Sequence, residues 1–216
     1  MSRQSPNIFS QLPKQLNNVS LTIMNSAHLT PNHLDKRRQI IKAAQNILRR
    51  EGIVACSSRA IAKESGFNKG LIHYYFNTVE QIIDEAIDEM VDKIVKKIRS
   101  TCARHEDPLQ RFWSVVEVHL SAFERPKGQT VLWMDYWTHT MHKSRGPILR
   151  RIDEAIIAAH TDALTEAKIS EPDTRARAIT AYVMGVAIRR AMGPQNDEEL
   201  RREIKLMCGD LETTAA

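Results

Sequence analysis

The segment 57–76, SSRAIAKESGFNKGLIHYYF, combines basic, aromatic and apolar residues in an ordered pattern. Its apolar residues, Phe76 among them, recur at a spacing that packs them inward, which leaves Lys69, His73 and Tyr74 facing outward. An ammonium group, an imidazole and a phenol on one exposed surface offer hydrogen bonds and positive charge to phosphates and base edges. This combination favours contact with nucleic acid over covalent catalysis.

Two short helices and a tight turn are needed to position these side chains. The first helix follows Ser57, whose hydroxyl can cap it, and ends at Gly66, a residue that tolerates a left-handed backbone. The second begins after Asn68. The residues expected to pack the two helices together are Ile61, Ala62, Phe67, Leu71, Ile72 and Phe76. A helix-turn-helix inserts the N-terminal part of its second helix into the major groove of DNA.

The order of the motifs is specific to one family. The chain carries a Ser cap, an Ile-Ala pair, a small-residue turn, a Lys-Gly step and an aromatic run, at Ser57, Ile61-Ala62, Ser65-Gly66-Phe67-Asn68, Lys69-Gly70 and His73-Tyr74-Tyr75-Phe76. A long helix is expected to follow. Over residues 37–85 the sequence resembles the TetR-type transcriptional regulators. The resemblance implies a three-helix DNA-binding domain followed by helices that bind a ligand and dimerise.

The resemblance implies a role for each outward-facing residue. Phosphate contacts are implied for Ser57, Arg59, Lys63, Tyr75 and Asn77. Positions at or near base edges are implied for Lys69, Gly70, Leu71, His73 and Tyr74. Asn68 also faces outward and is counted among the DNA-binding residues. Lysine can contact guanine acceptors or a phosphate, and Tyr75 fits core packing as well as a phosphate contact.

Three positions depart from the family pattern. Val79 stands where a lysine usually begins the long helix, so one phosphate contact is expected to be absent. His73 occupies a position where tyrosine is usual. Ala60 replaces an acidic residue, so Ser57 has no partner for a capping box.

The pattern beyond this segment predicts an all-α fold. Apolar residues recur at three- and four-residue steps, and Pro or Gly separates the periodic stretches. We expect helices over about 31–50, 58–66, 69–76, 78–104, 108–123, 129–143, 148–168, 172–192 and 197–208. The predicted domains are a disordered N-terminal tail (1–30), a helix-turn-helix DNA-binding domain (31–77) and a ligand-binding and dimerisation domain (78–210).

Positive charge is concentrated in the first third of the chain. The formal net charge is +5, and residues 31–77 hold nine basic and three acidic residues. Residues 78–216 hold 20 basic and 23 acidic residues. This asymmetry is expected if the first third meets a polyanion and the rest does not, although a solvated basic surface has the same composition.

Aromatic and sulfur-containing side chains cluster in the middle of the chain. Trp133 and Trp137 are four residues apart within VLWMDYWTHTMH. Such residues suit a mainly apolar ligand pocket with a few polar groups, and they also suit an ordinary helical core. The candidate ligand-binding residues are Trp113, His119, Phe123, Trp133, Tyr136, Trp137 and Met141.

The nature of the ligand stays open at the level of sequence. The C-terminal part loosely resembles the choline-responsive BetI-type repressors of betaine synthesis, in its aromatic helix, Gly-Pro step and Ala-rich helix. An aromatic cage suits a quaternary ammonium through cation–π attraction. Trp and Tyr also suit flat apolar ligands, so the small-molecule effector is left unidentified.

Residues 172–208 are expected to form a homodimer. Ala176, Ile179, Val183, Val186, Ala187 and Ile204 make apolar stripes, and Ala178, Ala181 and Gly185 permit close helix approach. Two such helices from each subunit would form a four-helix bundle. A dimer also places two recognition helices on a palindromic double-stranded DNA operator. An effector that tilts the helix at 78–104 would change their separation and release the DNA.

Other functional classes find less support. An effector-independent DNA-binding protein acting through a protein partner is the alternative hypothesis. We expect no enzyme, cofactor or metal site, since no G-x-S-x-G, P-loop or H-E-x-x-H pattern occurs. No signal peptide or membrane-spanning run is apparent. Three widely separated cysteines fit a reducing, cytoplasmic environment.

Overall fold

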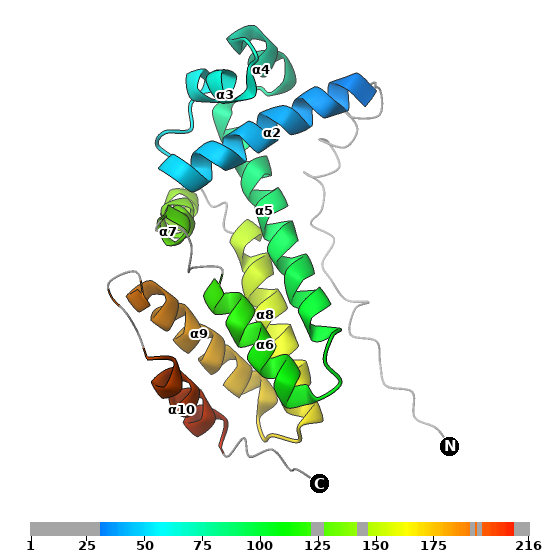
Figure 1. Cartoon of the computed structure of the whole chain (residues 1–216), viewed down its shortest axis with the longest axis vertical. Coiled ribbons are helices and arrows are strands. Elements are labelled where there is room, and N and C mark those ends of the chain that lie inside the picture. Colours follow the sequence, from blue (N-terminus) through cyan, green and yellow to red (C-terminus); the bar gives the residue numbers. More distant parts are fainter. Residues whose placement is uncertain (1–30, 122–127, 142–146, 191–192, 194–195, 210–216) are drawn as a thin grey trace. The chain divides into compact units, whose positions relative to one another are not determined.

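The computed structural model describes residues 31–121, 128–141, 147–190, 193 and 196–209 (Figure 1). The described residues form helices and connecting loops without a strand, which confirms the all-α fold. The expected tail, 1–30, lies outside the described residues. The helices are α2 (Pro31–Glu51), α3 (Ser58–Ser65), α4 (Lys69–Tyr75), α5 (Val79–Cys102), α6 (Pro108–Ser121), α7 (Gly128–Met141), α8 (Pro147–Glu166), α9 (Pro172–Arg190) and α10 (Asp197–Cys208).

The chain divides into two units, residues 1–39 and residues 40–216. The described part of the first unit is the beginning of α2. There Arg38 pairs with Asp35 at 3.5 Å, and both side chains are well exposed. An exposed pair of this kind adds little stability.

A first core, within the second unit, joins the short helices to α5 and α7. Its fully buried side chains include Ile47 and Leu48 of α2, Ile61 of α3 and Ile72 of α4. From α5 and α7 come Ile82, Ile83, Ala86, Ile87, Met90, Leu132, Trp133 and Tyr136. The periodic apolar faces of five helices thus converge on one core, which fixes α3 and α4 relative to α5.

A second core holds the remaining helices together. Phe112, Val116 and Leu120 of α6 pack with residues of α8, α9 and α10, namely Ala163, Leu164, Ala176, Ile179, Val183, Val186, Leu200, Ile204 and Cys208. A smaller cluster joins Ile98, near the end of α5, to Val115 and Val118 of α6 and Ile156 of α8. Helix α5 therefore contributes to the first core from Ile82 to Val95 and to the smaller cluster through Ile98.

Polar bridges reinforce the packing of α5 against its neighbours. Arg151 of α8 pairs with both Asp88 and Asp92 of α5. The hydroxyl of Tyr136 in α7 donates to Asp84 Oδ1 at 3.1 Å. These bridges cross between α5 and two other helices, so they resist sliding of α5 along its neighbours.

Two histidines are buried between α6 and α8. His160 is 0% exposed, and its ring centroid lies 4.7 Å from that of Phe112. Neither ring nitrogen of His160 has a hydrogen-bond partner within the described part of the chain. Burial lowers the pKa of His160 to about 3, with a smaller contribution from His119, and burial lowers the pKa of His119 to about 4. Both rings are therefore neutral in the folded chain.

These histidines predict a loss of stability in mild acid. Above about pH 6.5, the ordinary histidine pKa, these rings are neutral in both the folded and the unfolded chain. As the pH falls below this value, only the unfolded chain takes up the protons, so the free energy of unfolding decreases. Replacing His160 with leucine should remove about 2 kcal/mol of the decrease in unfolding free energy between pH 7 and pH 5. Urea unfolding at the two pH values measures it. The loop variant His105→Leu is the control, and an unchanged pH response in His160→Leu would refute the assignment.

Candidate nucleic-acid interface

Helix α3 is defined by its caps. The Ser57 hydroxyl accepts a hydrogen bond from the Ala60 backbone N–H at 3.2 Å, as expected from the sequence. Gly66 ends the helix with φ of 73°, in the left-handed region. The Ser65 hydroxyl donates to the Ile61 carbonyl at 2.7 Å. Helix α3 is thereby fixed at both of its ends.

Helix α4 has only seven residues, and its start is fixed by Asn68. The Asn68 side-chain oxygen accepts from the Leu71 backbone N–H at 2.8 Å. A Cβ added at Gly70 would lie 3.3 Å from this same oxygen, so even a methyl group there would crowd the cap. The side-chain oxygen of Asn68 therefore caps the helix, and its amide N–H groups can donate hydrogen bonds to a ligand.

The polar side chains of this segment are presented to solvent. Ser57, Arg59, Lys63, Asn68, Lys69, Gly70, His73 and Asn77 are all exposed. Tyr74 is 67% exposed, and its ring meets that of Tyr75 edge-on at a centroid distance of 5.1 Å. The structure thus leaves these predicted contact residues accessible to solvent.

Two predicted contact residues are partly withdrawn from that surface. Tyr75 is half-buried and packs against the first core, so the packing alternative left open by the sequence is the one the structure displays. Leu71 is half-buried, whereas Ile72, next to it, is 1% exposed. Of the residues expected to pack the helices together, Leu71 alone lies outside the first core and its partly buried neighbours.

The start of α5 carries a capping arrangement that the sequence analysis missed. The Thr78 hydroxyl accepts from the Gln81 backbone N–H at 3.1 Å, and Gln81 Oε1 accepts from the Asn77 backbone N–H at 3.1 Å. The signal was present, because Thr78 and Gln81 have the spacing of a capping box. This arrangement fixes the chain that leaves α4.

Two polar contacts to α2 that the sequence did not reveal hold α3 and α5 in place. Glu64 of α3 accepts hydrogen bonds from Asn46 at 3.2 Å and Arg50 at 3.1 Å, and those bonds, that of Arg50 first, lower the pKa of Glu64. Gln45, only 4% exposed, donates to the Ala86 carbonyl at 3.3 Å and to Glu89 at 2.9 Å in α5. A buried side chain bonded in this way specifies one register between α2 and α5.

Comparison with known proteins bears directly on this segment. The family model described as "Bacterial regulatory proteins, tetR family" matches residues 40–86, which contain α3, α4 and the start of α5. Over these residues the chain is similar to the tetR family. The HTH-type transcriptional regulator BetI of Vibrio campbellii is 23% identical over 174 residues, which cover 78% of this chain and 87% of that protein.

Solved structures share the TetR-family fold. A TetR transcription regulator from Haloarcula marismortui superposes with a TM-score of 0.69 at 18% identity, covering 81% of this chain and 96% of that one. A transcriptional regulator from Saccharomonospora viridis, in complex with choline, gives a TM-score of 0.65 at 19% identity, covering 79% and 94%. These likenesses show that the helices beyond the DNA-binding segment also follow the TetR arrangement.

The residues predicted to line an effector pocket fall into separate places. Trp133 lines a cavity of about 190 Å³, and Trp113 lines another of about 350 Å³. His119 and Tyr136 are buried, and Trp137 is 51% exposed. Phe123 and the side chain of Met141 lie outside the described residues. The predicted set is not gathered around one space in the described part of the chain.

The larger cavity lies among α6, α9 and α10, and its charges are paired. Arg201 pairs with Glu117 at 3.0 Å, and Arg190 pairs with Asp197. The Arg201 guanidinium also lies 5.1 Å from the ring centroid of Trp113. Cation–π and ion-pair contacts thus already engage the polar groups of this cavity.

In the helices predicted to dimerise, the apolar stripes that the sequence analysis assigned to the interface are buried within the chain. The apolar residues Ala176, Ile179, Val183, Val186 and Ile204 pack into the second core of their own chain. Ala178, Ala181 and Gly185, together with Leu206 of α10, are exposed instead. The apolar stripes were therefore wrongly assigned to the dimer, because α6 and α8 cover them within the same chain.

Membrane and metal sites would point to other functional classes. Each helix within the described ranges is too short or too polar to span a lipid bilayer. Within the same residues, no group of three or more His, Cys, Asp or Glu side chains is placed to hold a metal ion.

Gly66 predicts a measurable backbone penalty. Because nothing lies within 4 Å of a Cβ added there, substitution acts through the left-handed φ alone. Gly66→Ala should lower the free energy of unfolding by about 1 kcal/mol, and Gly66→Asn should lose less, since asparagine visits this region more readily. Chemical denaturation measures both variants. An alanine variant as stable as wild type would show that the turn relaxes out of this conformation.

Proposed function

We propose that this chain is a sequence-specific DNA-binding transcriptional regulator, a repressor that leaves its operator when a small molecule binds. The observation that carries the proposal is the exposed face of a capped α4, on which Lys69, His73 and Tyr74 lie together over a buried Ile72. A helix of this kind enters the major groove, where its first residues meet base edges.

In the proposed complex, α3 and the ends of the motif contact the DNA backbone. Ser57, Arg59, Lys63 and Asn77 are exposed polar or basic residues suited to phosphates, and Tyr75 contributes only the edge of a half-buried ring. Contacts to phosphate oxygens position a protein on the duplex without selecting sequence. They also make its affinity fall with added salt.

The proposed base contacts come from the start of α4. Lys69 can donate to guanine acceptors, and the amide of Asn68 and the ring of His73 add hydrogen-bonding groups. Gly70 and Leu71 let this part of the helix approach the groove closely, because one has no side chain and the other presents a methyl-bearing surface. Tyr74, being largely exposed, reaches beyond the helix toward the same groove wall.

We propose that residues 172–208 form a homodimer through their exposed face. Ala178, Ala181 and Gly185 on α9 allow the backbone of a second helix to approach closely, and the exposed Leu206 on α10 adds apolar area. Two copies related by a twofold axis would place two α4 helices on a palindromic operator.

The proposed response to a small molecule draws on two observations. The chain is similar along most of its length to BetI regulators, and one protein with this fold was solved with choline. Helix α5 connects the first core to the smaller cluster around Ile98, so a ligand that shifts α5 would also shift α3 and α4. Ligand and DNA would then weaken each other's binding by the same factor.

Two alternative functions make different predictions. A regulator that works through a protein partner would bind DNA with no small-molecule release. An enzyme finds no support in the relatives, which are transcriptional regulators. A regulator of this kind would act in the cytoplasm, in contact with its operator DNA.

Lys69 gives the direct test of the DNA-binding surface. Lys69→Ala should weaken binding to DNA from upstream of the chain's own gene by about tenfold, since one charged contact to a base or phosphate is lost. Fluorescence anisotropy across a salt series measures the affinity. A uniform loss with a shallower salt dependence assigns Lys69 to a phosphate, and a loss of preference over random DNA assigns it to a base.

The matched control is Lys96→Ala, which removes an exposed lysine near the C-terminal end of α5. It should leave the affinity for DNA near that of wild type. Equal losses in the two variants would mean that only total charge matters, which contradicts a recognition helix at α4.

The dimer face makes a separate prediction. Ala181→Arg places a long charged side chain on the exposed face of α9, so the dimer should dissociate to a monomer of the same helical content. Ala158→Arg, on the exposed face of α8, is the control and should remain dimeric. Light scattering coupled to size exclusion measures the mass. A dimeric Ala181→Arg would move the interface away from this face.

A further inference from the structure

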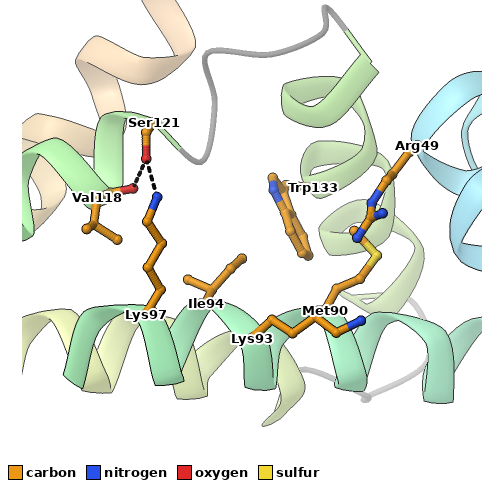
Figure 2. Close-up of a pocket in the computed structure, with 8 residues that line it drawn as sticks. All are labelled: Arg49, Met90, Lys93, Ile94, Lys97, Val118, Ser121 and Trp133. Carbon is orange, nitrogen blue, oxygen red and sulfur yellow. Dashed lines mark hydrogen bonds between the residues drawn. The ribbon is translucent and has the colours of Figure 1, made fainter. Parts of the chain in front are cut away.

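The cavity beside Trp133 is built from four helices of the second unit (Figure 2). Helix α2 contributes one side chain, α5 contributes four, α6 two and α7 one. The lining residues are Arg49, Met90, Lys93, Ile94, Lys97, Val118, Ser121 and Trp133. The cavity therefore lies where the last turn of α2 meets the helices that follow the DNA-binding segment.

Three of the lining residues are basic and none is acidic. Arg49, Lys93 and Lys97 form no ion pair with a carboxylate of the described residues. The lysines meet neutral groups, as Lys93 Nζ donates to Gln45 Oε1 at 3.4 Å and Lys97 Nζ donates to Ser121 Oγ at 3.4 Å. Figure 2 shows the second of these bonds at one end of the cavity.

The guanidinium of Arg49 has unused hydrogen-bonding capacity. Its Nε is buried and has no acceptor among the residues that the structure describes. The side chain extends from α2 into the space between Trp133 and Met90 (Figure 2). A buried N–H left without an acceptor costs free energy, and a carboxylate is the acceptor whose two oxygens match the guanidinium fork.

The placement of the lysines also favours binding of an anion. Lys93 and Lys97 are four residues apart on α5, so they are neighbours of like charge on one helix face. Glu89, the acid one turn earlier, already accepts the hydrogen bond from Gln45 and does not line the cavity. A bound anion would offset the mutual repulsion of three cations, none of which pairs directly with a described carboxylate.

The remaining wall is apolar. Met90, Ile94, Val118 and the indole of Trp133 offer a surface for a hydrocarbon or aromatic group. Inorganic phosphate or sulfate would leave this wall in contact with water. The cavity thus combines a cationic set of donors with an apolar wall, in a volume of about 190 Å³.

We propose that this cavity binds a small organic carboxylate with an apolar tail, and that this carboxylate is the effector, an inference that rests on the function proposed above. The carboxylate group lies between Arg49 and the lysines of α5. The tail lies against Trp133, Met90, Ile94 and Val118.

The same charges argue against a quaternary ammonium in this cavity. A cation cage needs several aromatic faces, whereas this cavity has one aromatic residue and three cations in its lining. The larger cavity lined by Trp113 gives no comparable preference, because its arginines are paired with Glu117 and Asp197. The likeness to a protein solved with choline is a likeness of fold, and the charges of this cavity do not favour a cation in it.

The position of Arg49 explains how such a ligand acts on DNA binding. Arg49 lies in the last turn of α2, eight residues before the cap of α3. An anion held jointly by Arg49 and Lys97 draws the end of α2 toward α5 and α6. Because Glu64 ties α3 to α2 through Asn46 and Arg50, that displacement is passed to the helix-turn-helix.

The test is calorimetric titration of the full-length chain with matched probes. Phenylbutyrate, phenylbutanol and phenylbutylamine share one apolar group and differ in charge, and hexanoate, octanoate, indoleacetate and choline complete the panel. We expect the best carboxylate to bind at least about tenfold more tightly than its amine or choline. Its affinity should fall as salt is added, because exposed charges are screened.

Substitutions locate the site. Lys97→Gln and Arg49→Gln should each weaken carboxylate binding by about five- to tenfold, and Arg49→Lys should recover part of the loss. Lys96→Gln, the exposed neighbour of Lys97 outside the cavity lining, is the control and should bind as wild type does. Circular dichroism confirms that each variant is folded.

The outcomes separate this inference from the proposed function. Three results would overturn the anion site. The amine or choline could bind more tightly than the carboxylates, or Lys96→Gln and Lys97→Gln could weaken binding equally. The third is that no carboxylate of the panel binds at millimolar concentration. DNA binding is measured on the same preparation without ligand. Its absence would overturn the proposed function and leave the calorimetric result standing.

Discussion

The shortness of α4 is the constraint on which the rest of this structure depends. A seven-residue helix is far too short to be stable alone in water, so its shape has to come from its surroundings. Asn68 caps its start, Gly66 turns the chain into it, and Ile72 and Phe76 are buried in the first core. The core beneath α4 holds its exposed face in one shape that can match a DNA groove. A frayed helix would lose conformational entropy each time it bound DNA, which would weaken binding.

The same constraint explains why a signal elsewhere in the chain can control DNA binding. Because α4 has no independent stability, whatever moves its supports moves its exposed face. Those supports are α2, joined to α3 through Glu64, and α5, joined to α2 through the buried Gln45. The cationic cavity opens among α2, α5, α6 and α7, next to both joints. A regulator built in this way needs no long pathway, because the ligand and the recognition helix share the same two supporting helices.

The sequence predicted the fold and the position of the DNA-binding segment, because both depend on local signals. Helical periodicity, the Ser57 cap, the stop at Gly66 and the Pro-Gly interruptions are features of neighbouring residues. What the sequence did not reveal depends on long-range contacts. Gln45 sits on an apolar face of α2 and becomes a buried bridge only when α5 is placed against it. Trp133 and Trp137 share a helix spacing, yet one is buried and the other is 51% exposed. The cationic cavity combines Arg49 with Lys93 and Lys97, which lie more than 40 residues away.

If α4 presents a sequence-selective surface and two copies act together, the chain should select a symmetric DNA site. In vitro selection from a pool of random duplexes, with the chain as bait, measures this. We expect enrichment of a palindrome whose half-site centres lie about one helical turn, roughly 10 base pairs, or a multiple of it apart. Enrichment of no sequence, or of a single asymmetric site, would refute a dimer that reads DNA through α4.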